Sequence, residues 1–159
     1  MVRVERIKLE DIHDEKLDLA LRRWFQLCGE SGLYPRERLG FGLLVGTPEV
    51  MNGRSGVVAC DTDDPLNFVI AYYGNDFKVY DGKSLVATRF CDLPDRDVAE
   101  VAVGCYMEAI KERKPIAHRM HATFGGVAVS YDRLILPTVN GENQIDRLVT
   151  VSRELNRSS

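Results

Sequence analysis

The chain has 159 residues, of which 45% are hydrophobic, as is typical of one domain with a sizeable core. Its formal net charge of −3 gives no general electrostatic argument for binding nucleic acid. No apolar run is long enough to span a bilayer, and residues 1–15 contain no apolar signal-peptide core. We therefore expect a cytoplasmic protein with neither a membrane nor a nucleic acid as its partner.

The N-terminal part predicts one amphipathic helix over residues 14–28. Asp14 can cap its first turn, and Gly29 can end it. Apolar residues recur at helical spacing and form a single stripe, made of Leu17, Ala20, Leu21, Trp24, Leu27 and Cys28.

Residues 32–56 are rich in glycine and are broken by Pro35 and Pro48, which predicts a loop with one short helix over 37–45. The GFGLLVG stretch within them does not follow a strand and open a helix, so its glycines predict no dinucleotide site.

Two strands are predicted over residues 57–60 and 68–73, and the short connection between them favours an antiparallel pair. The connection contains DTDDP, which has neither the glycine nor the distal glutamate of a calcium-binding loop. We interpret it as a turn and expect no metal site.

Four cysteines are spread along the chain without a C-x-x-C pair, so their spacing indicates neither a zinc knuckle nor a redox motif. They are Cys28, Cys60, Cys91 and Cys105. Because free cysteine behaves as a small hydrophobe, we expect buried free thiols.

After an irregular stretch with short turns of helix, residues 96–113 predict a long helix that Asp95 can cap. Alternation in the strand Ile116–Phe124 predicts two faces. One face carries Ile116, His118, Met120, Ala122 and Phe124, and the other carries Ala117, Arg119, His121 and Thr123. Asn140-Gly141, which tolerates positive φ, then predicts a hairpin between the last two strands.

This order of elements predicts an α+β domain with one antiparallel sheet. The stretches DGKSL, AIKERKP and YDRLILPTVNGENQIDRLVTV resemble a PAS domain, a small sensor module of signalling proteins. WFQLCGESGLYPRERL resembles the leader of a subgroup of short single-domain PAS proteins. The resemblance implies a PAS-like five-stranded antiparallel sheet with helices on one face. It places a leader helix and an irregular segment in residues 1–54, packed on a sensor domain in residues 55–159.

The resemblance also implies a pocket between the sheet and the long helix, where some PAS domains hold haem, flavin or a small metabolite. Small helix side chains face medium-sized strand side chains here, so close packing and a modest cavity both remain open. The candidate ligand-binding residues are Ala102, Cys105, His118 and Met120, with Tyr131 at the edge and Tyr72 nearby.

The sequence does not identify a cofactor. Leu85 stands where flavin-binding photosensor PAS domains have a reactive cysteine, so we expect no covalent flavin chemistry. The long helix has no histidine, which leaves Cys105, Tyr106 and His118 as candidate haem ligands. For His118 we favour a hydrogen-bonded histidine at the boundary between sheet and helix.

In PAS proteins the final strand passes the signal to a following effector, but only SRELNRSS follows here. We expect that the chain passes its signal on by contact with another protein, such as a histidine kinase. The alternative is that the chain is a fragment of a longer protein. The leader helix with Trp24 either pairs across a homodimer or packs on its own sheet. We expect an open sheet face with Arg119, His121, Asp132, Arg147 and Thr150, of which Arg119, His121 and Arg147 are the candidate partner-binding residues.

The resemblance therefore implies a sensory or regulatory signalling module without enzymatic activity, acting through protein contacts and tuned by a small ligand. The alternative is a protein that binds haem or another small molecule, or an enzyme, on a similar α+β scaffold. No catalytic residues are predicted, because no Ser/His/Asp or Cys/His spacing stands out.

Overall fold

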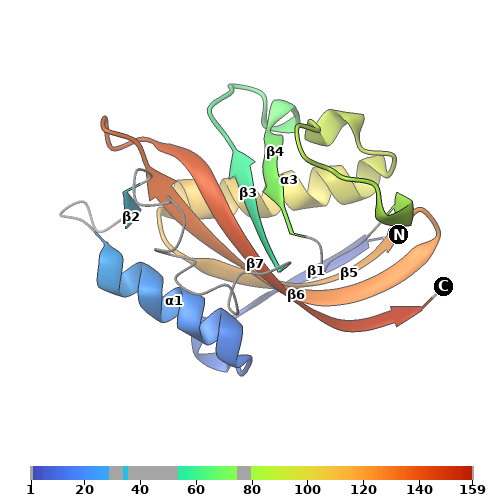
Figure 1. Ribbon diagram of the computed structural model, residues 1–159, viewed down its shortest axis with the longest axis horizontal. Coiled ribbons are helices and arrows are strands. Elements are labelled where there is room, and N and C mark those ends of the chain that lie inside the picture. Colours follow the sequence, from blue (N-terminus) through green and yellow to red (C-terminus); the bar gives the residue numbers. More distant parts are fainter. Residues whose placement is uncertain (1, 29–33, 36–53, 75–79, 159) are drawn as a thin grey trace.

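The computed structural model describes residues 2–28, 34–35, 54–74 and 80–158 (Figure 1). The elements in chain order are β1 (Val2–Ile7), α1 (Glu15–Leu27), β2 (Tyr34–Pro35), β3 (Ser55–Ala59), β4 (Val69–Tyr73), α3 (Arg96–Glu112), β5 (Ile116–Phe124), β6 (Val127–Val139) and β7 (Ile145–Ser158). Short 3-10 turns lie at Leu9–Asp11, Pro65–Asn67, Tyr80–Gly82 and Phe90–Asp92. The predicted short helix over 37–45 and the GFGLLVG stretch lie outside the described residues.

Within the described residues, six strands form one antiparallel sheet in the order β1-β5-β6-β7-β3-β4. The two-residue strand β2 pairs in parallel with β6. The predicted α+β class is confirmed, whereas the sheet has β1 in addition to the five expected strands. β1 pairs with β5 along its whole length, from Val2 opposite Ala122 to Ile7 opposite Ala117. Its sequence, VRVERI, is largely exposed, and the alternation of Val2 and Val4 with Arg3 and Glu5 is a short strand signal that the prediction missed.

The leader helix α1 and the long helix α3 pack on different faces of the sheet. Figure 1 shows α3 and α1 on opposite sides of the sheet. Asp14 caps α1 by accepting from the backbone N–H groups of Lys16 and Leu17, as expected. The apolar stripe of α1 packs on the sheet against Ala117, Leu134, Leu136, Val139, Val149 and Val151.

α3 covers the other face and encloses the larger part of the core. Its buried residues are Val98, Ala99, Ala102, Val103, Cys105, Tyr106 and Ala109. Asp95 precedes the helix as predicted, but its carboxylate accepts from the backbone N–H of Gly125 at 3.0 Å instead of capping α3. It thereby ties the start of α3 to the turn between β5 and β6.

The predicted hairpin between β6 and β7 is present, but the turn is longer than Asn140-Gly141 indicates. Val139 pairs with Ile145, which leaves residues 140–144 in the connection. The side-chain oxygen of Asn140 accepts from the backbone N–H groups of Glu142 and Gln144, at 2.9 and 3.0 Å. Asn143, with a φ of 60°, holds the left-handed position that we had assigned to Asn140-Gly141.

Candidate functional site

A cavity of about 80 Å³ lies between α3 and the sheet, next to β3 and β4. The apolar part of its wall comprises Val57, Val58, Ile70, Leu85, Phe90, Leu93, Val98, Ala102 and Phe124. The polar part comprises Tyr72, Tyr80, Tyr106, Tyr131, Arg133, Thr150 and Ser152, and Gly56 completes the lining. A single water needs about 10–15 Å³ of such space, so the cavity has room for about five to eight water-sized groups.

Three of the six candidate ligand-binding residues line this cavity, namely Ala102, Tyr131 and Tyr72. Cys105, His118 and Met120 are buried on the same side of the sheet but are not part of its wall. The cavity is therefore displaced from the predicted position towards β3 and β4.

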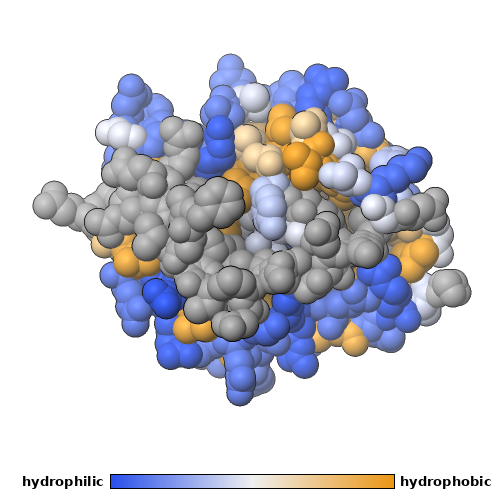
Figure 2. All heavy atoms as spheres, viewed as in Figure 1, coloured by the Kyte–Doolittle hydropathy of each residue, from blue (hydrophilic) through white to orange (hydrophobic). Residues whose placement is uncertain are grey.

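Tyr72 has an exposed fraction of 48% and lies on the edge strand β4. Val86, in the segment that follows β4, is exposed to a similar extent at 46%. Figure 2 shows apolar atoms gathered over β4 and the neighbouring 3-10 turns, on a surface that is otherwise largely hydrophilic in this view. This side of the cavity wall therefore reaches the surface of the described part of the chain.

Arg133 is the residue of the cavity that sequence reasoning missed. It is 5% exposed and lies on β6, two residues after Tyr131, with its side chain on the α3 face of the sheet. The guanidinium carbon lies 4.9 Å from the centre of the Tyr106 ring and 5.9 Å from that of Tyr131. Period-two alternation from Tyr131, which we had placed at the pocket edge, was the signal that could have found it.

The guanidinium of Arg133 has few hydrogen bonds for a buried cation. Its Nη1 donates to the hydroxyl of Tyr106 at 3.2 Å, whereas Nε and Nη2 are buried without a hydrogen-bond partner among the described residues. The ion pairs of the described residues include no carboxylate bound to it. Buried charges are normally paired and hydrogen-bonded, so a buried guanidinium with two nitrogens free of hydrogen bonds to the described residues is an unusual feature of the cavity wall.

The charge state of the site follows from its burial. Burial acts to lower the pKa of Arg133, but Tyr106, Tyr131 and Cys105 raise it above the usual value, so the guanidinium stays charged. Burial raises the pKa of Tyr131 to about 12 and also raises the pKa values of Tyr106 and Cys105. At neutral pH the described cavity wall therefore carries one positive charge beside neutral phenols, and the thiol of Cys105 behind the wall is neutral as well.

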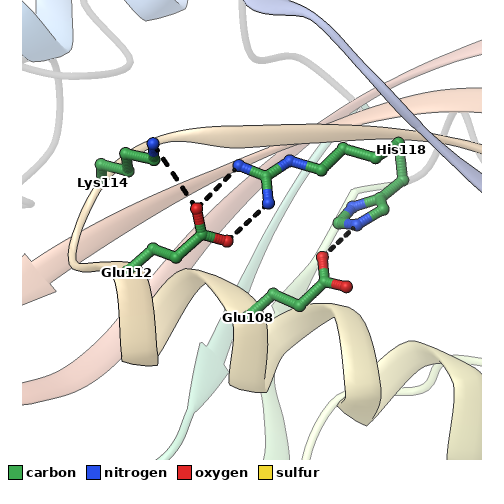
Figure 3. Close-up of polar contacts among 5 residues, drawn as sticks. Glu108, Glu112, Lys114 and His118 are labelled. Carbon is green, nitrogen blue, oxygen red and sulfur yellow. Dashed lines mark hydrogen bonds and ion pairs between the residues drawn. The ribbon is translucent and has the colours of Figure 1, made fainter.

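His118 belongs to a second polar cluster, which joins α3 to β5 and β1 (Figure 3). Its Nε2 lies 2.7 Å from a carboxylate oxygen of Glu108. One turn further along α3, Glu112 binds both terminal nitrogens of Arg6, at 2.5 and 3.0 Å, and Lys114 at 3.5 Å. His118 thus lies at the boundary between sheet and helix, as the sequence favoured, but only its Nε2 is hydrogen-bonded, and Nδ1 is buried without a hydrogen-bond partner among the described residues.

Trp24, a candidate partner-binding residue, is 2% exposed and packs on its own sheet. Its indole Nε1 donates to the backbone carbonyl of Pro137 at 2.8 Å. It is therefore part of the core under α1 and does not belong to the surface of this domain. The first helix therefore packs on its own sheet, which was one of the two alternatives left open for it.

The other candidate partner-binding residues lie on the α1 side of the sheet and have partners within the chain. Arg119 pairs with Asp132 at 2.7 Å, and Nδ1 of His121 lies 2.8 Å from the hydroxyl of Ser130. Arg147 lies 3.4 Å from Asp61. This face is only partly open, because α1 covers the portion around Ala117 and Leu134.

Thr150, which we had placed with Arg119, lies on the opposite face. It stands opposite Ile135 on β6 and lines the cavity. The predicted membership of Thr150 in the open face was therefore wrong, because Thr150 is three residues from Arg147 and side chains at odd spacing in a strand point to opposite faces.

The remaining sequence expectations concern cysteines and the acidic turn. All four cysteines are free, and Cys60 and Cys105 are buried while Cys28 and Cys91 are partly exposed. In the DTDDP turn, the carboxylate of Asp64 accepts from the backbone N–H of Leu66 at 3.0 Å and caps the 3-10 turn that follows. The predicted turn at DTDDP is therefore present.

The chain was compared with known proteins. A scan against protein-family models and a search of curated proteins both find no match to this chain. In the described part of the chain, no helix has both the length and the hydropathy needed to cross a membrane.

Proposed function

We propose that the chain is a PAS-like sensory or regulatory module, tuned by a small ligand that binds between α3 and the sheet. The observation that carries the proposal is the cavity with the buried, unpaired guanidinium of Arg133. A cation without a counter-charge is costly inside a protein, and a ligand that completes its hydrogen bonds removes this cost.

The arrangement of elements supports the PAS-like assignment. A strand pair, β3 and β4, is followed by the long helix α3 and then by the antiparallel strands β5, β6 and β7. β7 returns to pair with β3, so the last strand lies inside the sheet beside the first strand of this unit. α3 covers the cavity, as the resemblance implies for the pocket helix.

The proposal includes signal output through contact with a partner protein. The portion of the α1 face that carries Arg119 and His121 is polar and only partly buried, so it can bind a partner such as a histidine kinase. A homodimer remains part of the proposal, but Trp24 would not form its interface.

The alternative, a haem-binding or other cofactor protein or an enzyme, has less support from the site. A cavity with room for about five to eight water-sized groups is small for haem or flavin. Burial raises the pKa of Cys105, so its thiol is not the activated thiolate that nucleophilic catalysis requires.

Ligand-induced shifts in melting temperature test this function. The wild type is screened against a library of small metabolites, together with Ala102→Phe, which fills the cavity, and Met107→Phe, which adds the same ring on the exposed side of α3. We expect at least one compound to raise the melting temperature of the wild type and of Met107→Phe but not of Ala102→Phe. If no compound acts, or if every shift persists in Ala102→Phe, the pocket has no such function.

A further inference from the structure

The free hydrogen-bond donors of Arg133 identify the kind of group that the cavity can bind. Nε and Nη2, which have no hydrogen-bond partner among the described residues, form one edge of the planar guanidinium. Two parallel N–H bonds from such an edge match the two oxygens of a carboxylate. The third nitrogen, Nη1, is already held by Tyr106, which fixes the plane of the group.

The charge balance of the cavity favours a ligand with one negative charge. Among the described residues that line it, Arg133 is the one cationic side chain, and none is an aspartate or a glutamate. The hydroxyls of Thr150 and Ser152 are additional polar groups of the wall. A doubly charged phosphate would bring one charge more than the described wall neutralises, whereas a monocarboxylate brings the matching one.

The rest of the wall determines the body of the ligand. Val58, Ile70, Phe90, Val98 and Ala102 present hydrocarbon to the cavity, and small-molecule sites of this kind bind an apolar body oriented by a few polar groups. The cavity volume of about 80 Å³ corresponds to about five to eight non-hydrogen atoms of water size.

From these three observations we infer that the cavity binds a short-chain monocarboxylate, with its carboxylate on Nε and Nη2 of Arg133 and its hydrocarbon chain against α3 and β4. This inference rests on the proposed function of the cavity and adds the chemical class of the ligand. The specificity is for the charged head group, because a hydrocarbon wall discriminates weakly between chain lengths.

The test compares carboxylates with their uncharged amides. Binding of butyrate and valerate, and of butyramide and valeramide, is measured by titration calorimetry at constant ionic strength. The variants are Arg133→Met, Arg133→Lys and the control Arg22→Met, whose arginine is exposed on α1 beyond the opposite face of the sheet. We expect the wild type and Arg22→Met to bind the carboxylates and not the amides. Arg133→Lys, which keeps the charge without the two-donor edge, should bind at least tenfold more weakly, and Arg133→Met should not bind.

A second measurement does not depend on the folding of any variant. The Nε–H resonance of Arg133, assigned by NMR in the wild type, should shift on titration with butyrate and not with butyramide. Equal binding of amides, carboxylate binding that survives in Arg133→Met, or an unmoved Nε–H resonance would each overturn the inference. If neutral metabolites bind the cavity while no carboxylate does, the proposed pocket survives and the carboxylate inference fails. If no compound of either kind binds, both fail.

Discussion

The imidazole of His118 on β5 lies 2.7 Å from the carboxylate of Glu108 on α3, and the two side chains differ greatly in their surroundings. The His118 side chain is 3% exposed, whereas that of Glu108 is 48% exposed. Burial lowers the pKa of His118, and the hydrogen bond in which the Glu108 carboxylate accepts opposes this effect without reversing it. The histidine is therefore neutral in the folded protein at neutral pH.

This arrangement predicts a loss of stability in acid. The unfolded chain binds a proton at His118 near the ordinary histidine pKa of about 6.5, before the folded protein does. The free energy of unfolding should therefore fall as the pH drops below about 6.5 and towards the lowered folded-state pKa. His118→Asn should remove this part of the pH dependence in urea unfolding measured between pH 5 and 8.

Glu108→Gln should extend the loss to lower pH, because Glu108 is the group that raises the pKa of His118. Glu100→Gln on the same helix, where Glu100 pairs with Arg96, is the control and should leave the dependence near pH 6 unchanged. An identical pH profile for the wild type and His118→Asn would show that other groups cause the acid sensitivity.

The sequence predicted elements whose signals are local. The cap at Asp14, the helical stripe ending near Cys28 and the alternation of Ile116–Phe124 all correspond to observed elements. It did not predict β1, because the alternation of Val2 and Val4 with Arg3 and Glu5 is too short to be a strong signal. It also did not predict the face on which α1 packs. An amphipathic stripe indicates that a helix is buried on one side and does not indicate which surface covers it.

The candidate site was predicted only in part for a related reason. Ala102 and Tyr131 follow from helix and strand periodicity, and both line the cavity. Arg133 was missed because arginine is rarely fully buried, so a basic residue in a strand is normally assigned to the solvent face. Alternation correctly put His118 on the α3 face, but it could not predict that His118 lies outside the cavity. Alternation specifies the face of a sheet, whereas the position of a cavity on that face depends on tertiary packing.

The indole of Trp24 is expected to hold α1 on the sheet. Trp24→Phe keeps most of the ring but leaves the buried carbonyl of Pro137 without this donor, at a cost of about 1–3 kcal/mol in the free energy of unfolding. Trp24→Ala should cost about 3–5 kcal/mol because it also leaves a cavity. Urea unfolding followed by circular dichroism measures both effects.

Gln26→Ala, an exposed position on the same helix, is the control and should change stability by no more than about 0.5 kcal/mol. Similar small effects for all three variants would mean that α1 contributes little to the stability of the domain.

Two glycines provide a paired test of packing next to the cavity and on the outer side of α3. A Cβ at Gly56 on β3 would lie 2.8 Å from Oγ1 of Thr150 and 3.2 Å from the backbone oxygen of Tyr72, so Gly56→Ala should destabilise by about 1–3 kcal/mol. A Cβ at Gly104 on α3 meets no atom within 4 Å among the described residues. Gly104→Ala should therefore stabilise by about 0.5–1 kcal/mol, since alanine favours the helix interior. Thermal and urea unfolding of the two variants should shift in opposite directions, and a shift in the same direction would contradict this geometry.

Arg133 should lower the stability of the ligand-free protein. Desolvation of a guanidinium costs several kcal/mol. The compensating interactions are one hydrogen bond to Tyr106, worth about 1.5–3 kcal/mol, ring contacts worth about 2 kcal/mol, and a contribution from Cys105, which also raises the pKa of Arg133. Replacement by an apolar side chain of similar length should thus be neutral or stabilising. For Arg133→Met we expect a free energy of unfolding unchanged or raised by up to about 4 kcal/mol.

The comparison that isolates the charge is between Arg133→Met and Arg133→Ala, measured by urea unfolding of protein dialysed free of small molecules. Arg133→Ala removes the same charge but also the packing of the long side chain against Tyr106 and Tyr131, so it should be less stable than Arg133→Met by about 2–5 kcal/mol. If both variants are destabilised equally, the guanidinium is held by interactions stronger than those described. If the ligand-free wild type is less stable than Arg133→Met, as we expect, then the cavity keeps the charge of Arg133 at the expense of stability. Such a cost is typical of a residue that serves binding.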